Sequence, residues 1–386
     1  MARAGFVGRD ALGQYDLGAD HPLSPLTREL AVGLIRAYGL LDRPDVELID
    51  PEPISDALIE EVHDPAYVAM VKRYADNPME ATSLDAMAWG LAAWGDTPPF
   101  AGMHEAASDV CSASVTAALA VWNGQVDQVF CPGGGLHHAL KAKANGFCTY
   151  NDPAIAIQAM LDAGAERIAY VDVDVHHGDG TQFLFYDDPR VLTCSVHESG
   201  KFLFPGTGDI SERGEGEGLG TAINIPLPPY SGSGPYLRAV TEVIVPAVTA
   251  FAPQVLVTQN GVDPHHQDPL AHLQVTMDAF PTLWATLHSL ARDAAGGRWV
   301  ALGGGGYNVD VLPRAWALLF ADMVGADLAD ELPQSWHAQA QERTGRSLTP
   351  ALMQEAPFAI DQPERERADD EANAVVDAAK AEFGVS

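Results

Sequence analysis

Tyr170-Val-Asp-Val-Asp-Val-His-His-Gly-Asp-Gly180 joins an apolar β-strand to a cluster of polar side chains. Alternate side chains of a strand point to the same face, so Asp172, Asp174 and His176 share one face. Two carboxylates and an imidazole on a buried strand are costly to desolvate without compensation. The stretch therefore predicts a metal site with Asp174 and His176 as ligands; a strand end with satisfied polar groups is the alternative. Asp172 lies deeper and is expected to hydrogen-bond a neighbour or to bind a second cation.

Short apolar runs recur along the chain and alternate with helical stretches. Strands are predicted at residues 46–49, 126–131, 168–173, 191–195, 255–258 and 299–302, and helices at residues 26–38, 103–122, 153–163, 236–250, 277–293 and 310–323. This alternation indicates an α/β fold, with a parallel sheet covered by helices on both faces. No linker rich in proline, glycine or serine divides the chain, so a single domain over residues 1–386 is expected.

The composition excludes several classes of protein. With 22 basic and 53 acidic residues, the formal net charge is −31. Such a chain repels phosphate backbones and anionic lipids, so neither a nucleic acid nor a membrane is an expected partner. The cysteines form no CxxC pair, no apolar run approaches the roughly 18 residues of a membrane span, and residues 1–20 lack a signal-peptide core. We expect a cytoplasmic protein, with a solvated acidic helix over residues 355–382.

A third metal ligand is expected from another strand end. Residues 255–263, Val-Leu-Val-Thr-Gln-Asn-Gly-Val-Asp, run from a buried strand into a polar loop that contains Asp263. In open parallel sheets, ligands bind in the crevice outside the carboxyl ends of the strands. Asp174, His176 and Asp263 would leave a coordination position open for water, as catalytic zinc sites do. Without the first motif, Asp263 would be interpreted only as a turn-forming aspartate.

Six of the 13 histidines occur as three adjacent pairs, each just after a predicted strand. His137 and His138 follow three glycines, which permit positive φ and let two imidazoles point at one place. Imidazoles suit proton transfer near pH 7 but need orienting carboxylates, for which Asp172 and Asp179 are available. Two structural histidines in a glycine turn are the alternative.

Tyr307 follows four glycines after the last predicted strand. A phenol in this position can donate to a developing oxyanion, although a tyrosine after glycines is usually a packing residue. The chain contains no GxxxxGK[ST] phosphate loop, no HExxH motif and no GxSxG motif. These absences argue against dinucleotide and nucleotide enzymes.

Five ordered motifs make the chain resemble the zinc-dependent histone deacetylase superfamily, and within it the bacterial acetoin-utilisation type. The motifs are GGGLHHA at Gly133–Ala139, GFCTYND at Gly146–Asp152, DVDVHHGDG at Asp172–Gly180, FPGTGD at Phe204–Asp209 and GGGGY at Gly303–Tyr307. The resemblance implies the arginase/deacetylase fold, an open eight-stranded, mainly parallel sheet between helical layers. It places the core at about residues 21–325 and leaves residues 326–386 as an acidic helical extension.

The resemblance also implies roles for individual residues. The matches to the zinc ligands are Asp174, His176 and Asp263. The matches to the catalytic groups are the pair His137 and His138, the orienting carboxylates Asp172 and Asp179, and Tyr307, which polarises the acyl carbonyl. The substrate-binding matches are Asp96 at the rim and Gly146, Phe147, Phe204 and Leu270 at the acyl-lysine tunnel. A potassium site beneath the zinc matches Asp172, Asp174, His176, Ser195 and Val196.

The chain departs from the family pattern in two places. His265 and His266 follow Asp263, and they either narrow the site, contact the substrate or lie on a surface loop. The arginine that lines the internal exit channel of the family falls, without gaps, on Thr27. Because Arg28 is one position away, we carry this role over to neither residue.

The implied reaction is hydrolysis of the acetyl-lysine amide in proteins or peptides, with acetylated metabolic enzymes among the candidate substrates. His138 is expected to be the proton shuttle and His137 its electrostatic partner. A site of one histidine and two aspartates admits zinc or iron(II). Two alternatives stay open: a small-molecule amidohydrolase, acting on acetylated polyamines or resembling arginase, and a catalytically silent regulator that binds an acyl group or a metal.

Overall fold

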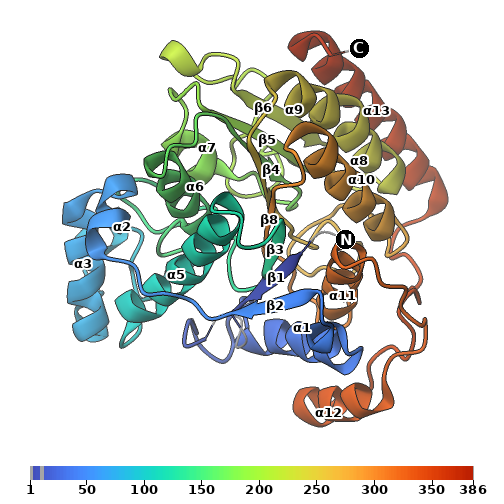
Figure 1. The fold of residues 1–386 in the computed structure, drawn as a ribbon, viewed down its shortest axis with the longest axis horizontal. Helices are drawn as coiled ribbons and strands as arrows, with labels where there is room; N and C mark the ends of the chain where they lie inside the picture. Colours follow the sequence, from blue (N-terminus) through green and yellow to red (C-terminus); the bar gives the residue numbers. More distant parts are fainter. Residues whose placement is uncertain (1–2, 9–12, 386) are drawn as a thin grey trace.

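Eight parallel strands form the centre of the computed structural model, which describes residues 3–8 and 13–385 (Figure 1). The strands are β1 (Ala4–Val7), β2 (Val46–Ile49), β3 (Gln128–Cys131), β4 (Ile168–Asp172), β5 (Val191–Glu198), β6 (Ala222–Leu227), β7 (Val255–Gln259) and β8 (Trp299–Leu302). Their order across the sheet is β2-β1-β3-β8-β7-β4-β5-β6, and every neighbouring pair is parallel. The open parallel sheet confirms the predicted fold class.

Most strands lie where the apolar runs predict them. β2 and β8 have the predicted bounds, whereas β5 continues beyond the prediction to Glu198. The sequence pattern misses β1 and β6. β1 is only 4 residues long and contains Gly5, and β6 contains Asn224 and Pro226, so the apolar pattern of each is weak. A proline in a strand is tolerated at the edge of a sheet, which is where β6 lies.

Helices cover both faces of the sheet (Figure 1). One face packs against α2 (Asp56–Val62), α3 (Pro65–Asp76), α5 (Met103–Trp122) and α6 (Asp152–Asp162). The other face packs against α1 (Pro25–Ala37), α8 (Ser233–Ala239), α9 (Val245–Phe251), α10 (Ala279–Ala294), α11 (Leu312–Met323) and α13 (Gln362–Phe383). The remaining helices are α4 (Leu84–Ala88), α7 (Asp179–Leu184) and α12 (Gln334–Thr344), and a π-helical turn at Val240–Ile244 joins α8 to α9.

Alternate residues of most strands contribute to two separate apolar cores, whereas β6 contributes to only one of them. On β4, Ala169 and Val171 belong to the core beneath α1 and α11, whereas Ile168 and Tyr170 belong to the core beneath α5 and α6. This two-sided burial explains why the central strands are almost continuously apolar. The polar residues that follow the strands are consequently gathered at the carboxyl edge of the sheet.

The acidic C-terminal stretch is helical only from Gln362, so the predicted helix over residues 355–382 begins too early, and the prediction of a solvated tail is wrong. α13 buries Ala368, and it places Ala372, Val376 and Ala379 in the same apolar core as α8. α13 contacts α8 and β6, and Figure 1 shows it in red beside α8 and α9. The charged residues of α13 mask this apolar stripe in the sequence, because they outnumber the small residues that pack.

Other expectations concern membrane association and disulfides. Within the described part of the chain, no helix combines the length and the apolar character that crossing a membrane requires. All four cysteines are buried and free. Residues 1–2, 9–12 and 386, which the predicted single domain includes, lie outside the described residues.

Candidate active site

The three predicted metal ligands converge beyond the carboxyl ends of β4 and β7. β4 ends at Asp172, and the chain then bends so that Asp174 Oδ1 accepts a hydrogen bond from the backbone N–H of His176 at 3.0 Å. His176 Nδ1 lies 3.1 Å from Asp174 Oδ1 and 3.2 Å from Asp263 Oδ2. All three residues are buried, and one ligand atom from each lies within 4.8 Å of the other two.

These residues fit a divalent cation. Burial and the neighbouring Asp174 carboxylate raise the pKa of Asp263, because two adjacent buried carboxylates repel each other and a cation relieves that repulsion. Gly305 donates its N–H to Asp174 Oδ2 at 2.7 Å, and a Cβ at Gly305 would lie 2.0 Å from Asp263 Oδ2. Gln259, which the sequence analysis does not single out, donates to Asp174 Oδ2 at 2.6 Å.

His137 and His138 lie beside this group, on the loop that follows β3. His137 Nδ1 is 2.7 Å from Asp172 Oδ2, and His138 Nδ1 is 2.7 Å from Asp179 Oδ1. Each imidazole therefore donates from Nδ1 to its own carboxylate. The two Nε2 atoms face each other at 3.0 Å, so one ring donates to the other through a proton between them.

The surrounding charges separate the pKa values of the two histidines. Burial lowers the pKa of His137, but the carboxylates of Asp172 and Asp174 outweigh burial and raise this pKa to about 9. Burial and the charge on His137 hold the pKa of His138 well below its usual range. His137 is therefore the protonated partner and donates from Nε2, and His138 is the neutral ring whose Nε2 lone pair accepts a proton, the form that a general base requires.

A buried carboxylate without a predicted role holds the glycine loop that carries the two histidines. Asp152 Oδ1 accepts from Leu136 N at 2.7 Å, and Asp152 Oδ2 accepts from Gly135 N at 2.9 Å and Ser114 Oγ at 2.5 Å. Asp152 belongs to the motif Gly146–Asp152, so its presence is visible in the sequence. Its partners are far away along the chain, and only the fold brings them together.

Tyr307 lies on the loop after β8 and borders the same site. Its ring centroid is 5.8 Å from that of Phe147, and its backbone N–H donates to Asp268 Oδ2 at 2.9 Å. Burial, together with the carboxylates of Asp263 and Asp174, raises the pKa of the phenol. The phenol therefore keeps its proton and can act as a hydrogen-bond donor.

Arg28 is a site residue to which the sequence analysis assigns no role. Its guanidinium is buried, and Nη2 donates to the carbonyl oxygen of Gly304 at 2.8 Å. Among the described residues, Nη1 of Arg28 has no hydrogen-bond partner. The guanidinium interacts electrostatically with Tyr307, Asp263 and Asp174, which shows that it lies near the base of the site.

Three of the predicted substrate-binding residues lie beside His138 or Tyr307: Gly146, Phe147 and Phe204. The ring centroid of Phe204 lies 5.0 Å from that of His138, and Phe204 is 40% exposed. Gly146 lies between them, since a Cβ there would be 2.5 Å from His138 Cδ2 and 2.8 Å from Phe204 Cε1. The exposed Asp96 accepts from Gly146 N at 3.1 Å through Oδ2. Leu270 is partly exposed, and its N–H donates to Asp268 Oδ1 at 3.0 Å.

The residues of the predicted potassium site come from two adjacent strands and their ends. Asp172 on β4 pairs in register with Ser195 on β5, while Asp174, His176 and Val196 follow them along the chain. The carboxylate of Asp172 accepts from Tyr170 OH at 2.7 Å and from Asp174 N at 3.2 Å. The potassium site stays a prediction.

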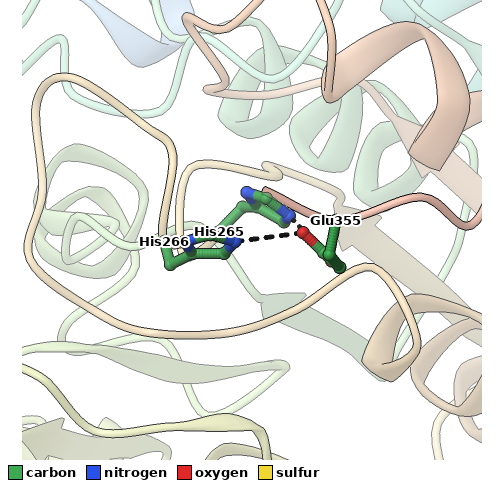
Figure 2. A group of neighbouring side chains, drawn as sticks. All are labelled: His265, His266 and Glu355. Atoms are coloured by element: carbon green, nitrogen blue, oxygen red, sulfur yellow. Dashed lines mark hydrogen bonds and ion pairs between the residues drawn. The ribbon is translucent and has the colours of Figure 1, made fainter. Parts of the chain in front are cut away.

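His265 and His266 do not lie on a surface loop, so that alternative is wrong. Both side chains are almost fully buried and contact Glu355 of the C-terminal extension (Figure 2). His265 Nε2 is 3.3 Å from Glu355 Oε1, and His266 Nε2 is 3.0 Å from Glu355 Oε2. No motif indicates this contact, because Glu355 lies in a stretch whose acidic composition predicts only a solvated helix.

Comparison with known proteins identifies similar chains. Residues 21–323 match the histone deacetylase domain. The chain is 38% identical to the acetoin utilization protein AcuC of Bacillus subtilis (strain 168) over 339 residues, which cover 88% of this chain and 86% of that protein. It is 35% identical to AcuC of Staphylococcus xylosus over 334 residues, 86% of each chain. The matched domain includes all the site residues described above except Glu355.

Proposed function

The chain belongs to the histone deacetylase family, whose members are hydrolytic deacetylases, and we propose that it hydrolyses the acetyl-lysine amide of proteins or peptides. The observation that carries the proposal is the pair of imidazoles beside the three-residue ligand group. Each imidazole has its own carboxylate, and their Nε2 atoms lie 3.0 Å apart. This arrangement provides one protonated and one neutral nitrogen at the same point.

The proposed activity depends on a metal ion, which the ligand group would hold. Asp174, His176 and Asp263 would hold zinc or iron(II), which when bound polarises a carbonyl group and lowers the pKa of water. The nitrogen and oxygen ligands admit either ion. We propose in addition that Asp172, Asp174, His176, Ser195 and Val196 bind potassium.

The residues of the chain itself handle the protons. His138 takes a proton from the attacking water at Nε2 and returns it to the leaving lysine amine. His137, kept protonated by Asp172, contributes a positive charge close to the developing oxyanion. The Tyr307 phenol donates a hydrogen bond to that oxygen, and such a donor typically contributes 10²–10³-fold to turnover.

The residues at the exposed side suit a neutral acyl-lysine. Phe147 and Phe204 present apolar rings next to Tyr307 and His138. We propose that Leu270 adds an apolar side chain to these walls. These walls favour an acetylated lysine over the charged product, because burying an ammonium is costly. We propose that Asp96 binds the backbone of the substrate at the rim.

The test compares the zinc-loaded wild type with the variants Tyr307→Phe and His138→Ala on a fluorogenic acetyl-lysine peptide. Both variants are expected to lose at least about 100-fold in kcat while retaining the zinc content of the wild type. Tyr38→Phe is the matched control, because Tyr38 donates to Ala329 O at the outer end of α1. A wild type without turnover, or variants as active as the control, would contradict the proposal.

The substrate class is tested with the same preparations. A panel of acyl-peptides, acetylated polyamines and acetylated metabolic enzymes is assayed side by side, and the highest kcat/KM is expected for acetyl-lysine in a peptide or protein. Higher kcat/KM on acetylated polyamines would overturn the lysine proposal but keep the deacetylase class. Tight acyl-ligand binding without turnover under zinc and iron(II) would instead indicate a silent regulator.

A further inference from the structure

The C-terminal extension contacts the loop that carries a metal ligand. We call residues 347–361 the strap and residues 264–277, which follow Asp263 directly, the metal loop. Glu355 of the strap accepts hydrogen bonds from His265 Nε2 at 3.3 Å and from His266 Nε2 at 3.0 Å (Figure 2). It also accepts one from the backbone N–H of Met277. The side chain of Glu355 is 28% exposed, and those of the two histidines are 0% and 2% exposed. One carboxylate thus joins the two ends of the metal loop.

The strap is itself held against the body of the protein. Arg314 of α11 is buried, and its Nη1 donates to the carbonyl oxygens of Leu352 at 2.9 Å and Gln354 at 2.8 Å. Phe358 packs on His266 with ring centroids 4.6 Å apart, and the Arg365 guanidinium lies 3.7 Å from the centroid of Phe358. The strap is therefore a fixed support, attached to the helix that follows the Tyr307 loop.

Two carboxylates, one just before the metal loop and one within it, reach the candidate active site. Asp263 precedes it, and Asp263 Oδ1 accepts from Val175 N at 2.9 Å beside the other ligands. Asp268 lies within it, donates its own N–H to His265 O at 2.8 Å and accepts from Tyr307 N at 2.9 Å. A shift of His265 and its neighbour would therefore move both a metal ligand and the residue that holds the backbone of Tyr307.

We propose that Glu355 is a positioning residue, which through His265 and His266 holds the metal loop so that Asp263 and Tyr307 stay in register. The proposal rests on the proposed function of this site. It assigns a role to a residue outside the matched deacetylase domain, which ends at residue 323. Partners of this kind that orient metal ligands typically contribute 10–100-fold to metal affinity or activity.

The same three side chains also satisfy the spacing of a second metal site, since their ligand atoms lie within 4.8 Å of one another. Two observations favour the hydrogen-bonded arrangement. The backbone N–H of Gln267 donates to His265 Nδ1 at 3.2 Å, so the ring proton of neutral His265 is on Nε2 and points to Glu355. Arg314 interacts electrostatically with Glu355 and His265, so a fixed positive charge already acts on the carboxylate and would oppose a bound cation.

The test compares Glu355→Ala and Glu355→Gln with Glu342→Ala, which removes an exposed acid on α12 of the same extension. Zinc affinity is measured by competition with a chelator, and hydrogen exchange of residues 264–277 is measured in the zinc-free protein. We expect Glu355→Ala to bind zinc about 10-fold more weakly and to exchange faster across the metal loop. Glu355→Gln keeps an acceptor for the N–H of Met277. Its zinc affinity and its exchange rate should therefore lie between those of Glu355→Ala and the wild type.

Turnover at saturating zinc separates positioning from general destabilisation. Because Tyr307 acts on the transition state, Glu355→Ala is expected to lower kcat about 10-fold with KM changed less than about twofold. Unchanged zinc affinity and unchanged exchange in Glu355→Ala would overturn the proposal. If the wild type binds a second equivalent of zinc, nickel or copper and Glu355→Ala does not, the positioning proposal is overturned, and the three side chains form a metal site instead. Affinity and exchange remain informative even if the wild type hydrolyses no acetyl-lysine peptide.

Discussion

Single atoms decide the shape of the ligand group at the residue scale. Gly305 approaches Asp174 and Asp263 so closely that its N–H bonds one carboxylate at 2.7 Å, while a Cβ would collide with the other at 2.0 Å. Real Cβ atoms do not approach oxygen this closely, so any side chain at residue 305 forces a ligand to move. Within the glycine run before Tyr307, residue 305 must therefore be glycine to leave room for the ligands.

Gly305→Ala should weaken zinc binding by about 10–100-fold, because the added methyl group displaces Asp263 or removes the N–H that Asp174 accepts. Zinc affinity is measured by chelator competition. Gly234→Ala is the matched control, since a Cβ at Gly234 meets no atom within 4 Å. Equal affinities for the two variants would contradict the expectation.

At the site, the sequence predicts the residues whose chemistry requires a metal ion or a proton partner. It does not predict the contacts that hold those residues in place. Two aspartates and a histidine after apolar strands predict a cation site because burial would otherwise be costly. Asp152 and Arg28 carry no such signal: each is one charged residue whose partners, Leu136 and Gly304, become neighbours only through the fold. His265 and His266 were visible as a pair, but their partner Glu355 was hidden in an acidic stretch.

At the scale of elements, His63 at the end of α2 connects a helix to the loop of the histidine pair. His63 Nδ1 donates to Leu140 O at 3.0 Å, and His63 Nε2 accepts from Asn151 N at 3.0 Å. Asn151 Nδ2 in turn donates to His137 O at 2.9 Å. These partners require neutral His63, because a proton on Nε2 would oppose the N–H of Asn151.

Burial lowers the pKa of His63 to about 4, whereas the imidazole in the unfolded chain has its ordinary pKa of 6.5. As pH falls, the unfolded state takes up the proton first, so this contribution to stability is present above 6.5 and is lost towards pH 4. His63→Gln should therefore lose less unfolding free energy than the wild type between these pH values, by about 3 kcal/mol. Urea denaturation at several pH values measures it, and parallel curves for the two proteins would contradict it.

The elements themselves were predictable in proportion to their apolar periodicity. α5 has the predicted bounds because its 20 residues are rich in alanine and apolar side chains. β1 and β6 escaped because a short strand with Gly5, or one with Asn224 and Pro226, resembles a loop in sequence. Both segments form strands because they pair with neighbours in the sheet: β1 with β2 and β3, and β6 with β5.

At the scale of the whole molecule, α13 completes one apolar core of the protein. α13 packs against α8 and β6, and its Val376 is fully buried. Arg238 of α8 adds a hydrogen bond to Asp377 at 2.9 Å. The extension is thus part of the folded body.

Val376→Asp should lower the free energy of unfolding by roughly 3 kcal/mol or more, because it places an unpaired carboxylate in an apolar contact. Urea denaturation of the variant measures the loss. Ala378→Asp adds the same charge on the exposed side of α13 and serves as the control, for which a change below about 0.5 kcal/mol is expected. Similar losses in both variants would show that net charge, and not packing, is responsible.

The strand order has a consequence for the protein while it is being synthesised. β8 is the last strand to leave the ribosome, yet it lies between β3 and β7 in the sheet. A nascent chain that ends before β8 has a gap in the middle of its sheet and lacks Tyr307. Copies that stop before residue 299 are therefore expected to lack the continuous sheet that brings the strand ends together.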